Sequence, residues 1–444
     1  MRFRRARFQA QHTVHLVLAP TRLLDILSRS VSLLVALLAV VLLGGSVRTQ
    51  CSTQWLSGGG FPGTNGPVRT MIPWDPDGPG PLSSVVAIGG TFTIAGSCTG
   101  ANIAAYDPVS ETWSTLGSGT NNTVNALTAR PNGDLIAAGL FTNAGGVIGV
   151  NRIARWNGSN WVAMTSMNNS AYALATLSNG DVVVGGDFTY ASGTFLRIAK
   201  WNGSTWSGLG SGANGRVSTL LALPNGNLIA GGAFTAIGGI SANRVAIWNG
   251  TSWSALGSGM NNEVSALAVM PGGDIVAGGL FTTAGGASAN YVARWDGMSW
   301  SALGTGVNST ARSLTTMPNG NLLVGGTFAV AGGVAAYRLA SWDGSTWSAP
   351  PAWPGGSVNT LVSLPSGEFM AAGDYIAQRP TVARFDGLNW LRVGTGFNVS
   401  VRADGARAMD ARVADCMLAV CDETHRGSAR RGARTWLAGM RRCS

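Results

Sequence analysis

The chain of 444 residues is basic overall, with 30 Lys and Arg against 20 Asp and Glu and a net charge of +10, but the charge is concentrated at its two ends. Residues 1–50 carry seven Arg and one Asp, residues 399–444 carry nine Arg and five acidic residues, and residues 51–398 carry fourteen basic and fourteen acidic residues. A nucleic-acid-binding surface needs Lys and Arg on the folded part of the chain, where they neutralise phosphates. The neutral middle therefore argues against nucleic acid as a partner.

The first 50 residues have the organisation of a secretory signal peptide. Arg2, Arg4, Arg5 and Arg7 precede an uncharged apolar run at residues 31–43, and two Gly and a Ser follow this run. The run is shorter than the roughly twenty apolar residues that cross a membrane as a helix, so an uncleaved membrane anchor is the less favoured alternative. We predict that residues 1–50 are a signal peptide with a long basic n-region, and that the protein is secreted or held at the cell surface.

Residues 51–398 contain seven copies of one repeated sequence. An aromatic residue marks the copies at Tyr106, Trp156, Trp201, Trp248, Trp295, Trp342 and Phe385, so the intervals are 50, 45, 47, 47, 47 and 43 residues. A nearly fixed period of this size indicates structural units that are stacked or arranged radially.

Turn residues divide each copy into four short predicted strands. In one copy, the apolar-rich runs 217–223 and 228–232 are joined by Pro-Asn-Gly, which indicates a hairpin. The runs 244–248 and 253–256 flank Asn249-Gly250, and Asn-Gly between β-rich runs is typical of a type I′ hairpin turn. A longer segment, 234–243, joins the two hairpins, and no segment has room for a helix.

Four antiparallel strands at this period predict an all-β fold, a β-propeller whose blades are packed radially. One Phe recurs in six copies and is predicted to pack between blades, at Phe92, Phe141, Phe188, Phe234, Phe281 and Phe328. The pattern GGxFTxAGG followed by ARWNGxxW resembles kelch-like repeats, and more closely the repeats of fungal cortical cell-polarity markers and of secreted bacterial propellers of unknown role. This resemblance implies a fold and leaves the function open.

Residues 399–444 depart from the repeat, since they lack its Gly-Gly, Asn-Gly and Phe-Thr signals. Their length nevertheless matches one more copy, Trp436 lies 46 residues after Trp390, and Trp55 with its neighbours resembles a lone fourth strand. Seven units are recognisable, and an eight-bladed ring closed by strands from both ends is the alternative. We interpret residues 51–398 as the propeller and residues 399–444 as a divergent or frameshifted, poorly ordered tail.

Histidine chemistry is excluded from the repeats, because His12, His15 and His425 all lie outside them. The propeller therefore has no imidazole for a catalytic triad or a zinc site, and no metal or cofactor site is predicted. We predict that the protein is not an enzyme.

Carboxylates are the remaining candidates for catalysis. Asp134, Asp181 and Asp274 occupy one turn position in their copies and are interpreted as turn residues. Asp187 and Asp374 follow the second strand, where other copies have Leu, Ala or Thr, and they lack such an explanation. A carboxylate-dependent enzyme acting on polysaccharide is therefore the alternative function.

The longer connections, which join the second strand to the third and the fourth to the next copy, are predicted to emerge on one face. Neutral amides recur on this face, and they suit hydrogen bonding to a glycan or a protein. The candidate binding residues are Asn121, Asn122, Asn168, Asn169, Asn214, Asn261, Asn262, Asn308, Asp187 and Asp374. These side chains could instead only satisfy the backbone of their loops. The favoured function is an exported, monomeric, non-catalytic module that binds an unidentified glycan or protein.

Overall fold

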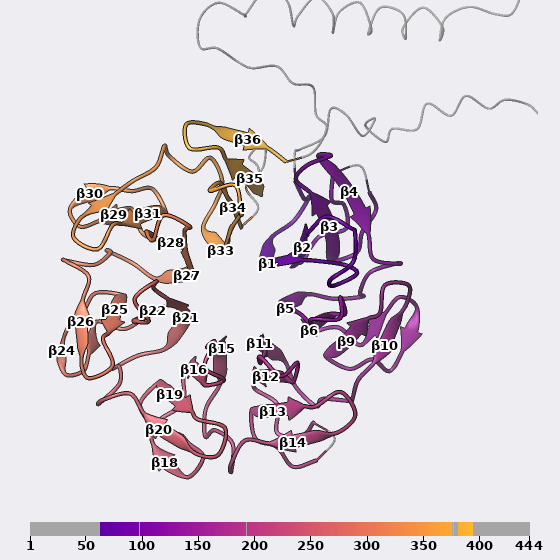
Figure 1. Ribbon diagram of the computed structural model, residues 1–444, viewed down its shortest axis with the longest axis horizontal. Coiled ribbons are helices and arrows are strands. Elements are labelled where there is room, and N and C mark those ends of the chain that lie inside the picture. Colours follow the sequence, from indigo (N-terminus) through magenta and orange to yellow (C-terminus); the bar gives the residue numbers. More distant parts are fainter. Residues whose placement is uncertain (1–62, 97, 192, 375, 377–380, 394–444) are drawn as a thin grey trace, which may run out of the picture. The chain divides into compact units, whose positions relative to one another are not determined.

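The computed structural model describes residues 63–393, except residues 97, 192, 375 and 377–380 (Figure 1). The described residues form seven four-stranded antiparallel sheets and contain no helix. These sheets are arranged as blades in a ring (Figure 1), so the predicted β-propeller is confirmed. The predicted signal peptide at residues 1–50 and the predicted tail at residues 399–444 lie outside the described residues.

Each blade is built from one continuous segment of the chain. The innermost strands of blades 1 to 7 are β1 (Val68–Trp74), β5 (Val124–Ala129), β11 (Ala171–Thr176), β15 (Val217–Ala222), β21 (Val264–Val269), β27 (Ala311–Thr316) and β33 (Val358–Ser363). The second strands are β2 (Val85–Gly90), β6 (Leu135–Gly139), β12 (Val182–Gly186), β16 (Leu228–Gly232), β22 (Ile275–Gly279), β28 (Leu322–Gly326) and β34 (Phe369–Gly373). The third strands are β3 (Ile103–Asp107), β9 (Ile153–Trp156), β13 (Ile198–Trp201), β19 (Val245–Trp248), β25 (Val292–Trp295), β31 (Leu339–Trp342) and β35 (Val382–Phe385). The outermost strands are β4 (Thr112–Thr115), β10 (Trp161–Ala163), β14 (Trp206–Gly208), β20 (Trp253–Ala255), β26 (Trp300–Ala302), β32 (Trp347–Ser348) and β36 (Trp390–Arg392).

The second strands are the most deeply buried elements of the fold. Leu-Ile-Ala-Gly-Gly in β16 and Val-Val-Val-Gly-Gly in β12 are buried at every position. Neighbouring blades cover both faces of such a strand, so its sequence is a continuous apolar run rather than an alternating one. The outermost strands are mostly exposed apart from their Trp: Trp300 is buried, whereas Ser301 and Ala302 are exposed.

The hydrophobic cores lie between blades. One cluster, for example, combines Ala126 and Ile136 of blade 2 with Val182 and Phe188 of blade 3. The recurring Phe residues are at most 3% exposed, so their predicted role in packing between blades is confirmed.

Four of the connections between the second and third strands contain a small additional hairpin that the sequence interpretation missed. These hairpins are β7 (Asn143–Ala144) with β8 (Val147–Ile148), β17 (Ala236–Ile237) with β18 (Ile240–Ser241), β23 (Thr283–Ala284) with β24 (Ala287–Ser288), and β29 (Val330–Ala331) with β30 (Val334–Ala335). A Gly-Gly pair forms each of their turns, and both glycines have positive φ. The Gly-Gly signal was present in the sequence, but two-residue strands are too short for a periodicity to reveal them.

The turn between the third and fourth strands was predicted one residue too early and with the wrong type. Trp248 pairs with Trp253, and Gly250 has a φ of 98°, whereas Asn249 is not among the residues with positive φ. A type I′ turn needs positive φ at both central residues, and positive φ at the first one alone is characteristic of type II′. The two central residues are therefore Gly250 and Thr251. Asn249 precedes them and accepts hydrogen bonds from the backbone N–H groups of Thr251 and Ser252, both at 2.9 Å.

The ring closes between blade 1 and blade 7. In every blade the Trp of the outermost strand donates its indole N–H to a backbone carbonyl of the preceding blade, at 2.8 to 3.4 Å. For blade 1 this bond runs from Trp113 to the carbonyl of Val393, after β36. Blade 1 thus has the same relation to blade 7 that every other blade has to its predecessor. The alternative of an eight-bladed ring is wrong for the described residues, because β1 packs directly against β33.

Candidate functional site

The candidate site is a hollow of about 410 Å³ at the axis of the ring, to which all seven blades contribute side chains. We call it the axial hollow. One residue from each innermost strand lines it: Arg69, Asn125, Tyr172, Ser218, Ser265, Arg312 and Asn359. Thr123, Arg216 and Glu263, which precede innermost strands, and Leu140, which follows a second strand, complete the lining. The hollow therefore opens on the face where the longer connections emerge, the face on which the sequence predicted a binding surface.

The sequence contained a signal for this ring of residues that its interpretation missed. The ring residue is the second of each innermost strand, and it stands between a Val or Ala and an Ala, Thr or Ser in all seven copies. Its neighbours are small or apolar throughout, yet the position itself changes among Arg, Asn, Tyr and Ser. A position that packs against identical surroundings in every blade would be expected to stay uniform. Its variation therefore indicates a side chain whose surroundings, which include the axial hollow, differ from blade to blade.

Asp187 and Asp374 lie beside the axial hollow, and each forms an ion pair with an arginine that lines it. Arg216 Nη2 is 2.9 Å from Asp187 Oδ2, and the guanidinium of Arg216 also stacks on the ring of Tyr172, 4.6 Å from its centroid. Arg312 Nη1 is 3.2 Å from Asp374 Oδ2 and 2.8 Å from Asn359 Oδ1. These two carboxylates therefore help to orient arginines from neighbouring blades.

Asp374 is held in its ionised form. Burial by itself would raise its pKa, but the hydrogen bond from Asn359 and the positive charge of Arg312, with smaller contributions from Ser357 and Arg69, lower the pKa below its ordinary value. The Nδ2 group of Asn359 donates to Asp374 Oδ1 at 2.8 Å and to the Val68 carbonyl at 3.0 Å. A general acid needs a raised pKa, so Asp374 has the wrong electrostatic environment for that role.

The predicted binding asparagines bond to the loops around them. Asn121, Asn168, Asn214, Asn261 and Asn308 each accept two backbone N–H groups from the next long connection, at 2.9 to 3.1 Å. The first four also donate to a Thr hydroxyl, at 2.8 to 3.0 Å. Asn122, Asn169 and Asn262 accept the N–H of the residue that follows them. These bonds use the hydrogen-bonding groups that a ligand would need, although binding by this face stays a prediction. Asn65, which the sequence interpretation omitted, makes the same bonds in blade 1.

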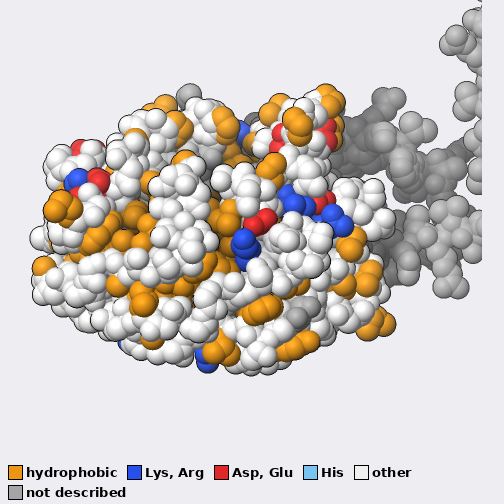
Figure 2. All heavy atoms as spheres, turned by 60° about the horizontal axis from the view of Figure 1, so that its bottom comes forward, with side chains coloured by type: hydrophobic (Ala, Val, Ile, Leu, Met, Phe, Trp, Pro, Cys, Tyr) orange, Lys and Arg blue, Asp and Glu red, His pale blue; other side chains and the backbone are white. Residues whose placement is uncertain are grey.

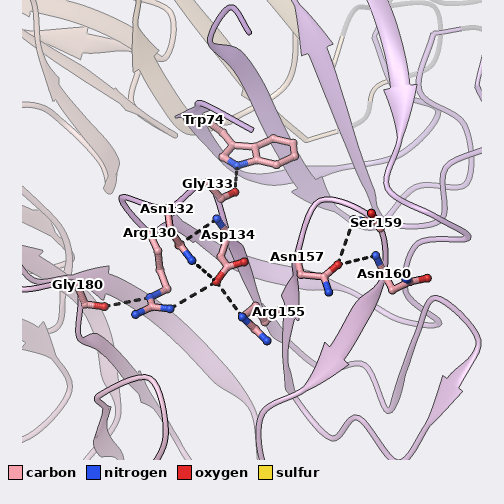
Figure 3. Close-up of polar contacts among 10 residues, drawn as sticks. All are labelled: Trp74, Arg130, Asn132, Gly133, Asp134, Arg155, Asn157, Ser159, Asn160 and Gly180. Carbon is pink, nitrogen blue, oxygen red and sulfur yellow. Dashed lines mark hydrogen bonds and ion pairs between the residues drawn. The ribbon is translucent and has the colours of Figure 1, made fainter. Parts of the chain in front are cut away.

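On the opposite face, the turn aspartates pair with cations of the third strand. Asp134 is only 6% exposed, and it lies 3.0 Å from Arg155 Nη1 and 3.4 Å from Arg130 Nη1 (Figure 3). Arg130 also donates to the Gly180 carbonyl at 3.1 Å, while Trp74 donates to the Gly133 carbonyl at 2.8 Å, so blades 1, 2 and 3 are joined here. Asp134 therefore holds its turn and also bonds to Arg155 across the sheet. Through Arg130 it is linked to the next blade.

The same pairing recurs wherever this turn position is acidic. Asp181 pairs with Lys200 at 3.0 Å, Asp274 with Arg294 at 2.7 Å and Glu368 with Arg384 at 3.8 Å. Where the position is Asn227 or Asn321, the third strand instead has Ile247 or Ser341. An acidic residue at the turn position thus occurs together with a basic residue in the third strand. This correlation between the two positions is visible in the sequence alone.

We expect the Asp274–Arg294 pair to stabilise the fold by about 0.5 to 1 kcal/mol, because Arg294 is 48% exposed and water screens the interaction. The variants Asp274→Asn and Arg294→Ile, alone and combined, form a double-mutant cycle whose end point copies the Asn227 and Ile247 of blade 4. Urea unfolding in low and high salt measures the coupling energy, which should fall as salt screens the charges. A coupling energy that does not change with salt would contradict this assignment.

Charged side chains are sparse on the face of the propeller that Figure 2 shows. Figure 2 shows a face made mainly of backbone and uncharged side chains, on which most basic groups lie beside acidic ones. Among residues 63–393, apart from those left undescribed, no three His, Cys, Asp or Glu side chains are grouped so that they could hold a metal ion. The same residues include no helix long and apolar enough to cross a membrane.

The fold defines the chain as a seven-bladed β-propeller with an asymmetric polar hollow on its axis. Residues 243–412, less than half of the chain, match the family model of the Rax2 C-terminal β-propeller domain. The chain is thus similar to Rax2-type propellers over this part, whereas no comparison confirms a relation to kelch repeats. No curated protein matches the chain in sequence.

Several solved structures are similar to the chain at low sequence identity. The extracellular domain of BT4673 from B. thetaiotaomicron has a TM-score of 0.49 and 10% identity, over 73% of this chain and 39% of that one. The RRP9 WD40 repeats have a TM-score of 0.49 and 12% identity, over 75% and 92% of the two chains. U3-55K has a TM-score of 0.49 and 12% identity, over 72% and 96%. The match spans about two fifths of the BT4673 structure.

Proposed function

We propose that the protein is an exported, non-catalytic binding module that takes up part of a glycan or protein in its axial hollow. The observation that carries this proposal is the ring of seven side chains of four kinds (Arg, Asn, Ser and Tyr) on an otherwise repetitive scaffold. The Tyr172 and Ser265 hydroxyls form no hydrogen bond with another described residue, and they lie where a ligand could reach them.

Export is the second part of the proposal, and it rests on the basic and apolar segments of residues 1–50. Mass spectrometry of the N-terminus of the protein recovered from outside the producing cell tests it. Cleavage after residues 44–50 supports export through a signal peptide, and an intact N-terminus on retained protein contradicts it.

The alternative of a carboxylate-dependent enzyme has less support from the geometry. Asp187 and Asp374 belong to different blades, and each is paired with an arginine. The lowered pKa of Asp374 also keeps it from donating a proton near neutral pH. A pair of carboxylates on opposite sides of one scissile bond is the minimum that glycoside hydrolysis usually needs.

Filling the axial hollow should abolish ligand binding and leave the fold intact. We expect the variant Ser265→Phe to weaken binding at least tenfold, because the new ring occupies space that the ligand needs, a loss of about 1.4 kcal/mol or more. The matched control is Ser301→Phe, on the exposed side of β26 in the same blade. Glycan arrays and pull-down assays with the full chain provide the measurement. Equal binding by both variants would show that ligands bind elsewhere.

A further inference from the structure

Two of the four charged side chains that line the axial hollow have no ion-pair partner among the described residues. Arg216 is paired with Asp187, and Arg312 with Asp374. Arg69 is exposed, and it forms neither an ion pair nor a side-chain hydrogen bond with any residue in the described part of the chain. Glu263 accepts a hydrogen bond from the Ser218 hydroxyl at 2.5 Å and has no cationic partner within 4.0 Å among the described residues.

These charges separate into two sides of the ring. Arg69, Arg312 and Asp374, from blades 1, 6 and 7, together carry a net charge of +1. Arg216, Asp187 and Glu263, from blades 3 to 5, together carry a net charge of −1. Arg69 and Arg312 both line the hollow, and the positive charge of each helps to lower the pKa of Asp374.

The positive side is held in place by Asn359. Its amide accepts from Arg312 at 2.8 Å and donates to the Val68 carbonyl at 3.0 Å, next to Arg69 in β1. Arg312 is therefore oriented by two partners, whereas the guanidinium of Arg69, which also lines the hollow, has no acceptor among the described residues. A planar guanidinium with free donors is suited to bidentate binding of a carboxylate.

The remaining lining favours a sugar over a peptide side chain. The Ser265 and Tyr172 hydroxyls form no hydrogen bond with another described residue and can donate or accept, as sugar hydroxyls do. Asn125, whose Nδ2 donates to the Ala171 carbonyl at 3.0 Å, and Glu263 can still accept. Leu140 is the one aliphatic side chain in the lining, and Arg216 already stacks on the ring of Tyr172. Peptide anchors usually enter pockets with apolar walls. The volume of about 410 Å³ lies at the low end of the range for ligand pockets, which suits the end of a chain.

We propose that the axial hollow binds the end of an acidic glycan, with a uronate carboxylate on Arg69 and the sugar hydroxyls on the amides and hydroxyls of the other blades. This inference rests on the proposed binding function, and it adds the class of ligand and the residue that selects it.

The test begins with the full chain on an array of oligosaccharides that contain uronates, oligosaccharides whose uronates have been reduced to neutral sugars, and a Glu-rich peptide. We expect uronate oligosaccharides to bind, their reduced forms to bind at least tenfold more weakly, and the peptide not to bind. Calorimetry then compares Arg69→Gln with Arg294→Gln, which removes the same charge on β25, away from the lining of the hollow. Arg69→Gln should weaken uronate binding about 10- to 100-fold, the range of a charge-assisted hydrogen bond, and Arg294→Gln should leave it unchanged.

Three results would overturn the inference: no uronate oligosaccharide binds, reduced and acidic forms bind equally, or Arg69→Gln binds as the wild type does. Binding of the peptide in place of the glycan would also overturn it and would identify a protein ligand. If a neutral glycan or a protein binds and Ser265→Phe blocks it, the acidic-glycan inference fails while the proposed function stands. If Ser265→Phe blocks nothing, both fail. Thermal unfolding of each variant shows whether its fold is retained.

Discussion

Replacing Gly279 with Ala is expected to destabilise the propeller by about 3 kcal/mol or more, the upper part of the range for overpacking a closed site. A Cβ at this position would lie 2.1 Å from the carbonyl oxygen of Glu263, a distance that real contacts do not reach. The register of β21 and β22 shifts between Val264 and Ala266, and this bulge presses the Glu263 carbonyl against the last residue of β22. The same close approach occurs at the last residue of every second strand, where the distances are 1.7 to 2.3 Å.

The neighbouring Gly278 provides the control for this prediction. Blades 2 and 7 already have Ala138 and Ala372 at the equivalent place, and a Cβ on Gly278 would meet the Ala311 methyl group at 3.1 Å. We expect Gly278→Ala to change stability by less than about 1 kcal/mol, because Ala in a strand interior offsets part of the crowding by reducing the freedom of the unfolded chain. Urea unfolding of both variants measures the difference. If Gly279→Ala loses as little stability as Gly278→Ala, the Glu263 carbonyl can move away from the added methyl group.

The architecture could be predicted from the sequence because one short pattern recurs seven times. Each turn signal was weak by itself, but its repetition at a period near 47 residues made a propeller the consistent interpretation. The number of blades in the closed ring was not determined by this reasoning, because it depends on a contact between residues far apart in the chain. Trp113 and Val393 are such a pair, and neither sequence position reveals the other.

The axial hollow opens on the face where the sequence predicted a binding surface, but different residues line it. Asn121 and its equivalents recur from copy to copy and were interpreted as candidate binding residues, whereas these amides bond to the neighbouring long connection. Arg69 and Tyr172 stand at a position that differs from copy to copy, so a search for recurring residues passed over them. In a repeat protein, the residues that build the scaffold are the same in every copy, whereas the residues that select a ligand differ from copy to copy. The partners of Asp187 and Asp374 also depend on contacts between blades, which no single copy contains.

Truncating Trp300 should be among the most damaging substitutions in the fold. Its ring is 6% exposed, lies 5.4 Å from the ring of Trp295, and donates to the Leu256 carbonyl of the preceding blade at 2.8 Å. We expect Trp300→Ala to lower the free energy of unfolding by about 3 to 5 kcal/mol, the usual cost of removing a buried aromatic side chain. Urea unfolding followed by circular dichroism measures this loss.

Trp300→Phe separates the hydrogen bond from the packing, because it keeps an aromatic ring and removes the N–H. The buried Leu256 carbonyl would lose its partner, at a cost of about 1 to 3 kcal/mol. Trp206 is the matched comparison, since its indole N–H lies 3.4 Å from the Met164 carbonyl and its side chain is only half-buried. Trp206→Phe should therefore cost less than Trp300→Phe. If the two Phe variants lose equal stability, the indole bonds contribute little to joining the blades, and the ring is held together by the apolar contacts alone.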